Sequence, residues 1–223
     1  MEIEYAVQEK PNGLAQAFVI GREFIGDDDV CLVLGDNIFF GHDLGSLLER
    51  DIYENKATVF GYYVSDPSRY GVVEFDDDGH AISIEEKPKK PKSNYAVVGL
   101  YFYPNDVVEV ASRIKPSKRG EYEITDLNRE YLKQNRLDVR LMGRGFAWLD
   151  TGTHNSLSDA TNFVRTLVDR TGLQIGCVEE IAYDKGWISS GQLKKLADNY
   201  GNSSYGAYLR TILSKCICTT TEV

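Results

Sequence analysis

Two aspartates in this sequence each follow a short apolar run of the kind that forms a buried strand. Asp36 follows Val30–Leu34, and Asp150 follows Phe146–Leu149. If both strands belong to one sheet, their carboxyl ends bring the two side chains to the same edge. Paired carboxylates there suit Mg²⁺, which uses few protein oxygens and completes its coordination with substrate phosphates. The alternative is two unrelated turn or helix-capping aspartates, each of which is common.

Two motifs that combine basic and acidic residues suit a sugar phosphate. Glu86 and Lys87 precede Pro88, which predicts an extended exit from a strand. The Lys87 ammonium suits a phosphomonoester, and the Glu86 carboxylate can accept hydrogen bonds from sugar hydroxyls. Arg119–Glu121 repeats the pairing of basic and acidic groups in a loop before a predicted helix. A solvated run of charge is the alternative for each motif taken alone.

Weaker candidates lie elsewhere in the chain. Tyr70 and Gly71 allow close approach of the backbone to a ligand, and the amide of Gln8 can hydrogen-bond a base edge. The acidic runs Asp27–Asp29 and Asp76–Asp78 lack the full ligand spacing of a calcium loop. We interpret both acidic runs as solvated turns.

The composition excludes several classes of protein. The net charge of −9 argues against a nucleic-acid binder, which normally carries a basic patch. No run approaches the roughly 20 apolar residues of a membrane span, and no signal-peptide pattern opens the chain. The four cysteines lack metal-site spacing and are interpreted as reduced thiols: Cys31, Cys177, Cys216 and Cys218. We therefore predict a cytoplasmic protein that binds neither nucleic acid nor membranes.

The first part of the chain alternates between strand and helix patterns. The patterns predict strands at 3–7, 30–34 and 57–64 and helices at 12–24 and 44–55. This alternation predicts a parallel sheet with right-handed crossovers. The continuous apolar run at 30–34 predicts a central strand that is buried on both faces.

The rest of the chain changes from a mixed pattern to a helical one. A hairpin is predicted at 70–75 and 81–85, with further strands at 95–103, 137–142 and 146–149. Helices are predicted at 105–114 and at 125–134, the latter capped by Thr125. Only helices follow, at 153–172, 189–201 and 204–216. We therefore predict a partial α/β core over residues 1–152 and a helical region over residues 153–223.

Six motifs occur in a fixed order along the chain. They are Gln8–Ala17, Leu34–Phe39, Asp66–Val73, Glu86–Pro88, Arg119–Glu121 and Trp148–His154. As an ordered set they resemble the bacterial glucose-1-phosphate thymidylyltransferases, and the resemblance covers nearly the whole chain. It implies an α/β fold with a Rossmann-like nucleotidyltransferase sheet and a C-terminal helical cap. It also implies transfer of a deoxythymidylyl group from dTTP to α-D-glucose 1-phosphate, which gives dTDP-glucose and pyrophosphate and opens dTDP-L-rhamnose synthesis.

The resemblance implies roles for individual residues. Asp36 and Asp150 would hold Mg²⁺, and Lys87 and Arg119 would act in catalysis by binding the sugar's phosphate. The nucleotide would contact Gln8, Gly13 and Leu14. The sugar phosphate would contact Tyr70, Gly71, Glu86, Lys87, Val97, Tyr101 and Arg119. A regulatory site at a subunit interface would include Phe40, Gly41, His42, Gly143, Arg144, Glu180 and Ile181, for which ordinary loop and helix-end residues are the alternative.

The chain departs from the family in one respect. The family opens with a strand, the motif Gly-Gly-x-Gly-Thr-Arg-Leu and a Lys-Gln pair, and neither motif occurs in these 223 residues. Because that loop cradles the triphosphate, we expect an N-terminally truncated member with an incomplete sheet, poor stability and weak or no catalysis alone. The alternatives are an inactive fragment that binds a sugar phosphate or sugar nucleotide, and an enzyme that prefers UTP. The family is homotetrameric, and whether this chain assembles without the missing segment stays open.

Overall fold

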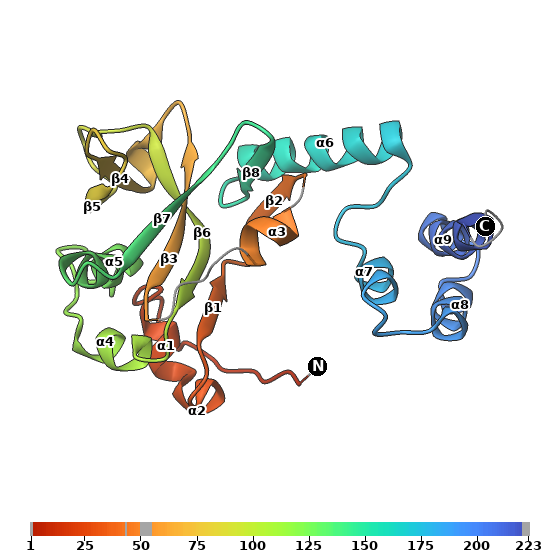
Figure 1. The fold of residues 1–223 in the computed structure, drawn as a ribbon, viewed down its shortest axis with the longest axis horizontal. Helices are drawn as coiled ribbons and strands as arrows, with labels where there is room; N and C mark the ends of the chain where they lie inside the picture. The colour runs from red at the N-terminus through yellow and green to blue at the C-terminus, as the bar shows by residue number, and fades with distance from the viewer. Residues whose placement is uncertain (1, 43, 50–54, 220–223) are drawn as a thin grey trace. The chain divides into compact units, whose positions relative to one another are not determined.

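The computed structural model describes residues 2–42, 44–49 and 55–219. The chain divides into two compact units, Met1–Thr153 and His154–Val223, which we describe separately (Figure 1). All described strands belong to the first unit, and the regular elements described in the second are helices. The assignment of 1–152 and 153–223 as two domains stays a prediction.

A six-stranded sheet forms the centre of the first unit. Its main path is β5–β4–β6–β3–β7, over Ala81–Glu86, Gly71–Phe75, Tyr95–Tyr103, Ala57–Tyr63 and Leu137–Met142. β1 (Val30–Val33) also pairs with β6, placing Val30 opposite Tyr103. The β3–β7 pair is parallel, and the other described pairs of the sheet are antiparallel. β6 consists mainly of β-branched and aromatic residues, which favour a strand with both faces covered.

A separate two-stranded ribbon supplies part of the candidate site. It consists of β2 (Asn37–Gly41) and β8 (Phe146–Asp150), which pair antiparallel. The register places Asn37 opposite Asp150. Residues more than a hundred positions apart in the sequence therefore meet at one end of this ribbon.

Each face of the main sheet carries a hydrophobic core, because successive side chains along a strand point to opposite faces. On β3, Val59 belongs to one core and Phe60 to the other. The first core is covered by α1 (Gln16–Ile20), α4 (Val107–Arg113) and α5 (Ile124–Lys133), and the second by α3 (Leu44–Glu49) and the β2–β8 ribbon. The first unit also holds α2 (Arg22–Ile25) and the 3₁₀-helix η1 (Pro67–Arg69).

The predicted strands after residue 56 are confirmed, whereas the predictions for the first 34 residues are partly wrong. Val30–Val33 is not a central parallel strand buried on both faces. It pairs antiparallel with β6, its partner among the described strands, and alternate residues along it are exposed. The run 3–7 is exposed coil, since no described strand pairs with it.

Several helix predictions need correction as well. The helix expected at 12–24 is two short helices, α1 and α2, which are separated at Gly21. Of the helix expected at 44–55, residues 44–49 are helical and 50–54 lie outside the described residues. Thr125 does not cap α5. It lies in the first turn of that helix, and its hydroxyl donates to Glu86 instead of to the helix backbone.

The second unit consists of α6 (His154–Thr171), α7 (Val178–Asp184), α8 (Ser190–Asn199) and α9 (Ser204–Thr219). Ser189 and Gln192 form a capping box at the start of α8, which confirms the predicted boundary there. The hydrophobic core of this second unit contains Cys177, Leu193, Ala197, Tyr208 and Leu209. α7 was not predicted as a separate helix. No helix in the described residues is long and apolar enough to cross a membrane.

The structure describes the side chains of two of the four cysteines. Cys31 is exposed and Cys177 is buried, and both are free thiols. Although Cys31 is exposed, partial desolvation by its neighbours raises the pKa of its thiol, which favours the protonated form. The prediction for Cys216 and Cys218 falls outside the described side chains.

Candidate active site

A cleft of about 500 Å³ opens on the first unit, between the β2–β8 ribbon and the main sheet. Residues that are far apart in the sequence line this cleft, and they include Asp36, Asp150, Tyr70, Gly71, Glu86, Lys87, Val97 and Tyr101. A neighbouring recess of about 330 Å³ is lined by Gln8, Gly13 and Leu14. Leu14, Glu86 and Lys87 line both hollows, so the two are adjacent.

Asp36 and Asp150 meet at the end of the β2–β8 ribbon, although by a different route from the predicted one. Asp36 immediately precedes β2 and Asp150 ends β8, whereas the sequence suggested the carboxyl ends of two strands of one sheet. The backbone N–H and the hydroxyl of Thr151 both donate to the carbonyl oxygen of Asp36, at 2.9 and 2.8 Å. The ribbon therefore fixes the two aspartates to each other through the backbone.

The Asp150 carboxylate has one firmly held oxygen and one that is held loosely. Its Oδ1 accepts from the Gly152 backbone N–H at 2.8 Å. Its Oδ2 lies 3.4 Å from the Tyr70 hydroxyl and 3.7 Å from the Arg69 guanidinium. Burial and the adjacent Asp150 charge raise the pKa of Tyr70, so this hydroxyl stays a neutral donor near pH 7.

The donor set at this end of the cleft fits a hard divalent cation. A Cβ built on Gly152 would lie 2.9 Å from Asp150 Oδ1 and 3.7 Å from Asp36 Oδ2, so both carboxylates border the same small space. Carboxylate oxygens are the ligands that Mg²⁺ prefers, and two of them leave coordination positions for phosphate oxygens. Glycine at position 152 keeps that space free of a side chain.

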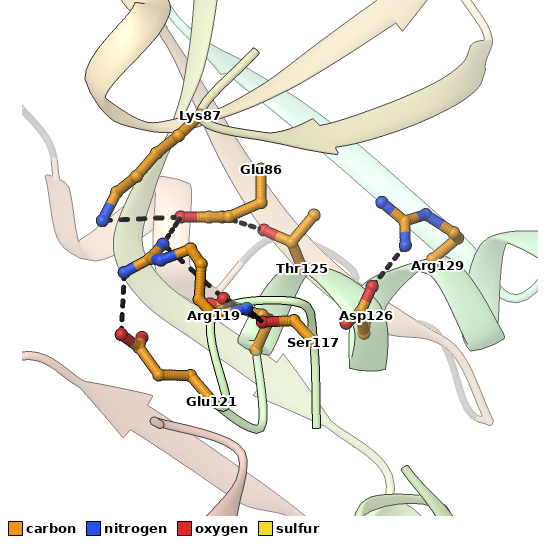
Figure 2. A network of polar contacts seen from close by, with 9 residues as sticks. Glu86, Lys87, Ser117, Arg119, Glu121, Thr125, Asp126 and Arg129 are labelled. Atoms are coloured by element: carbon orange, nitrogen blue, oxygen red, sulfur yellow. Dashed lines mark hydrogen bonds and ion pairs between the residues drawn. The ribbon is translucent and has the colours of Figure 1, made fainter. Parts of the chain in front are cut away.

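The Glu86 carboxylate is the centre of the second polar group in the cleft. Figure 2 shows one of its oxygens facing Lys87 and Arg119 and the other facing Thr125. The Lys87 Nζ lies 3.9 Å and the Arg119 guanidinium 3.8 Å from Oε1, and the Thr125 hydroxyl donates to Oε2. These long contacts to two half-exposed cations leave room for an anion to approach both.

The backbone of Lys87 does not have the extended conformation that Pro88 predicted. Its φ is +44°, in the left-handed region that residues other than glycine rarely adopt. Its N–H donates to the carbonyl oxygen of Tyr70 at 3.0 Å, which ties the end of β5 to the start of β4. The sequence did not indicate this conformation, because a residue before proline usually avoids helical backbone angles.

Arg119 lies in a loop with three carboxylates around it. Its guanidinium contacts Glu121 at 2.9 Å and the buried Glu123 at 3.5 Å, in addition to Glu86. The Ser117 hydroxyl donates to Glu123 and accepts from the Arg119 backbone N–H (Figure 2). Arg119 does not itself line the cleft, but the loop brings its guanidinium to Glu86, which does.

Glycine and aromatic positions shape the space between the two polar groups. A Cβ on Gly71 would lie 2.9 Å from the Thr125 hydroxyl, so this position admits no side chain without displacing Thr125. Tyr101 is buried in the floor of the cleft. Burial, followed by the charges of Glu86 and Asp36, raises the pKa of its hydroxyl above the ordinary value. Tyr101 therefore presents a neutral hydroxyl.

The recess beside the cleft is built on a tight turn. Gly13 has a φ of +110°, and a Cβ there would lie 2.4 Å from the Tyr122 carbonyl oxygen. The Gln8 amide nitrogen donates to the Gly13 carbonyl at 3.0 Å and to Gln16 at 2.8 Å. The Gln8 amide is thus fixed by both of its N–H groups, with its own oxygen on the opposite side.

The seven residues of the predicted regulatory site are distributed over both units. Phe40 and Gly41 lie on β2, His42 follows it, and Gly143 and Arg144 lie in the turn between β7 and β8. Glu180 and Ile181 lie on α7 of the helical unit, where Glu180 accepts a hydrogen bond from Tyr208 at 2.6 Å. None of the seven lines the 500 Å³ cleft, and their grouping stays a prediction.

Eight residues that line the cleft were not among the predicted site residues, and four of the eight have side-chain contacts with predicted ones. Arg69 and Asn37 adjoin predicted residues within two of the quoted motifs, and this adjacency was the available signal. Trp148 also belongs to a quoted motif, and its ring packs edge-on against Tyr70 with centroids 5.0 Å apart. Thr125 gave a helix-cap signal, which concealed its contact with Glu86.

The acidic turn of the β4–β5 hairpin holds one further group of oxygen and nitrogen ligands. Donor atoms of Asp76, Asp78 and His80 lie within 4.8 Å of one another, and all three residues are exposed. Asp76 accepts from the backbone N–H groups of Asp78 at 3.1 Å and His80 at 2.7 Å. The bond from His80 contributes most to lowering the Asp76 pKa. These bonds account for the turn without a metal.

Comparison with known proteins places this geometry in a family. The family model described as nucleotidyl transferase matches residues 1–166. The glucose-1-phosphate thymidylyltransferase of Neisseria meningitidis serogroup A (strain Z2491) is 55% identical over 216 residues, covering 96% of this chain and 75% of that protein. The enzyme of the same name from Xanthomonas campestris pv. campestris (strain B100) is 57% identical, covering 96% of this chain and 73% of that protein.

Solved structures agree with the sequence comparison. A Bacillus anthracis protein assigned as a glucose-1-phosphate thymidylyltransferase, crystallised with sucrose, matches with a TM-score of 0.65 and 42% identity, covering 73% of this chain and 65% of that one. A UDP-glucose pyrophosphorylase in complex with UDP-glucose matches with a TM-score of 0.62 and 26% identity, covering 71% of this chain and 64% of that one. The chain thus spans about two thirds to three quarters of the length of these proteins. It belongs to the nucleotidyl transferase family, among the glucose-1-phosphate thymidylyltransferases.

Proposed function

We propose that this chain transfers a deoxythymidylyl group from dTTP to α-D-glucose 1-phosphate, giving dTDP-glucose and pyrophosphate, the first step of dTDP-L-rhamnose synthesis. The supporting observation is one cleft that is lined by the paired carboxylates and by Glu86 and Lys87, with the Arg119 guanidinium 3.8 Å from Glu86. The names of the relatives favour this enzyme over an inactive fragment that binds a sugar phosphate or sugar nucleotide.

Asp36 and Asp150 are the residues that would hold Mg²⁺. When bound, the metal neutralises phosphate charge so that two anionic substrates can approach each other. The protein's own contribution is to fix the two carboxylates through the β2–β8 ribbon and Thr151. Tyr70 and Arg69 lie within 3.4 to 3.7 Å of Asp150 Oδ2, on the cleft side of this carboxylate.

The sugar phosphate would bind at the Glu86 end. Lys87 and Arg119 each lie almost 4 Å from Glu86. A phosphate can therefore bind both cations at shorter distances and replace Glu86 as their partner. The carboxylate of Glu86 then accepts from sugar hydroxyls, and Gly71, Val97 and Tyr101 bound the ring.

The reaction requires positioning and charge neutralisation rather than a covalent nucleophile. An oxygen of the sugar phosphate attacks the α-phosphorus of dTTP, and the bond to pyrophosphate breaks on the opposite side. Lys87 and Arg119 orient the attacking phosphate. The recess formed by Gln8, Gly13 and Leu14 would hold the thymine, because the fixed Gln8 amide presents an acceptor for a base N–H.

Location and partners follow the family in this proposal. We propose a cytoplasmic protein that acts on dTTP and glucose 1-phosphate, with no role for nucleic acid or membranes. The −9 charge of the chain is consistent with a small-molecule substrate that local cations recruit.

The decisive experiment measures two properties of the purified chain. The first is pyrophosphate release with Mg²⁺, glucose 1-phosphate and either dTTP or UTP, with Asp36→Asn as the control. The second is binding of glucose 1-phosphate by calorimetry. We expect Mg²⁺-dependent release that is weak in this chain alone, faster with dTTP than with UTP, and absent in the variant.

Each other outcome has a separate meaning. Binding of glucose 1-phosphate without release under any condition would favour the binding fragment. Faster release with UTP would replace the nucleotide in the proposal. Absence of both binding and release would contradict the proposed function.

A further inference from the structure

Asn37 lies where the start of β2 meets both β6 and β8. Its backbone pairs with Asp150 across the ribbon, and its side chain extends from the ribbon to the main sheet. The side chain contacts three groups from three different parts of the chain: Asp36, Gly99 and Trp148. No role was predicted for this residue.

The orientation of the Asn37 amide is dictated by its partners. Its Oδ1 lies 2.7 Å from the Trp148 indole Nε1 and 3.1 Å from the Gly99 backbone nitrogen. Both groups can only donate, so the Asn37 oxygen must face them. The amide nitrogen must then face Asp36, and it lies 2.7 Å from Asp36 Oδ1.

Gly99 gives the amide its space. A Cβ on Gly99 would lie 2.6 Å from Asn37 Oδ1 and 2.8 Å from a methyl carbon of Leu34. Any larger residue would displace either the amide or Leu34. A glycine in the middle of β6, which lowers strand stability by itself, is therefore accounted for by this close approach.

The contact with Asn37 determines which oxygen of Asp36 is available. Oδ1 is bound to the amide, whereas Oδ2 lies on the side of Gly152, where the space that a Gly152 Cβ would fill also borders Asp150 Oδ1. We infer that Asn37 is a positioning residue, which fixes the Asp36 carboxylate so that its Oδ2 faces Asp150. This inference rests on the proposed function, because the shared space between the two aspartates is its proposed metal site.

The test is binding of Mn²⁺, a paramagnetic substitute for Mg²⁺, to the whole chain, followed by electron paramagnetic resonance. Loss of a group that orients a ligand typically weakens metal binding roughly 10- to 100-fold, so we expect at least a ten-fold higher Kd in Asn37→Ala. Trp148→Phe removes one of the two bonds that orient the amide, and we expect a smaller change in the same direction. Asp36→Asn defines the loss of the site itself.

A matched control separates positioning from a general loss of stability. Asn94→Ala removes another part-buried asparagine, whose amide donates to Val64 at 2.8 Å, and it lies outside the cleft. We expect Asn94→Ala to lower the melting temperature without changing the Kd for Mn²⁺. Binding of glucose 1-phosphate serves as a second readout, which we expect to change less than two-fold in Asn37→Ala.

The outcomes distinguish failure of this inference from failure of the proposed function. Unchanged Mn²⁺ affinity in folded Asn37→Ala, with affinity lost in Asp36→Asn, would overturn the positioning role and leave the metal site intact. If Asn37→Ala does not fold, unchanged affinity in Trp148→Phe would overturn it. Unchanged affinity in Asp36→Asn would contradict the metal site and the inference together.

Discussion

The two units of this chain hold acidic side chains in contrasting surroundings. In the helical unit, Glu179 is buried in the first turn of α7. The Tyr200 hydroxyl donates to its Oε1 at 2.9 Å, and the Tyr205 hydroxyl donates to its Oε2 at 2.5 Å. Both carboxylate oxygens are therefore held by neutral donors from other elements.

The carboxylates of the cleft are held on one oxygen each. Asp36 is bound by Asn37, Asp150 by the Gly152 N–H and Glu86 by Thr125. The second oxygen of Asp150 and of Glu86 has contacts at 3.4 to 3.9 Å. One short hydrogen bond fixes the orientation of each carboxylate. It leaves the second oxygen, and the remaining lone pair of the bonded oxygen, available to a ligand. The comparison suggests that half-satisfied carboxylates mark the binding site, whereas Glu179 is structural.

The largest expected effect is that of Asp150→Asn. The variant retains the acceptor for Gly152 but loses the charge that would hold Mg²⁺, so we expect dTDP-glucose formation to fall roughly a thousand-fold, or about 4 kcal/mol. The measurement is the steady-state rate at saturating substrates. Asp78→Asn, in the exposed hairpin turn, is the matched control and should leave the rate unchanged. Equal losses in the two variants would break the distinction between cleft and surface carboxylates.

Lys87→Met tests the other end of the cleft. Methionine keeps the length of the side chain and removes the charge, so we expect the KM for glucose 1-phosphate to rise roughly a hundred-fold, or about 2.7 kcal/mol. Lys92→Met is the control, because Lys92 pairs with Glu74 at 2.6 Å and does not line the cleft. An unchanged KM in Lys87→Met would mean that the cation beside Glu86 does not receive the phosphate.

The strands of this fold were easier to predict than their pairing. β6 was predicted with its observed bounds, because nine apolar and aromatic residues form one uninterrupted run. The β4–β5 hairpin followed from the turn signal at Asp76–Gly79. The predicted parallel direction of β1 was wrong, because an apolar run indicates burial but not which strand lies beside it.

In the candidate site as well, individual residues were easier to predict than the contacts between them. Motif order indicated Asp36, Asp150 and Lys87, since these residues recur with their neighbours in a known family. The contact of Thr125 with Glu86 joins residues 39 positions apart, and that of Trp148 with Asn37 joins residues 111 apart. Such contacts depend on how the elements pack, which local patterns do not encode.

Glu179→Ala tests the structural side of the comparison. It leaves two tyrosine hydroxyls without their acceptor, and we expect the free energy of unfolding to fall by about 2 kcal/mol. The measurement is urea unfolding followed by the fluorescence of Trp187, the tryptophan of the helical unit. Glu109→Ala removes an exposed ion pair with Arg113 and should cost less than about 0.5 kcal/mol. A destabilisation no larger than that of Glu109→Ala would contradict the structural role of Glu179.

The smallest expected effect is the pH dependence that Glu179 gives to the helical unit. Burial alone would raise the pKa of this carboxyl, but the hydrogen bonds from Tyr205 and Tyr200 outweigh it and hold the pKa below its ordinary value. A carboxyl with a lowered pKa in the folded state stabilises the fold fully above its unfolded pKa. That contribution is lost as the pH falls through the lowered value. We therefore expect Trp187-detected stability to be constant from pH 7 to about 5 and to decline below it.

Tyr205→Phe sharpens this prediction. The variant removes the donor to Oε2, so the folded pKa of Glu179 should move up toward its unfolded value and the acid-dependent part of the stability should shrink. The variant is expected to be less stable at pH 7 but to lose less stability between pH 5 and pH 3 than the unmodified chain. Parallel losses in the two proteins would assign the acid sensitivity to other carboxylates, and the contrast between Glu179 and the cleft would then rest on geometry alone.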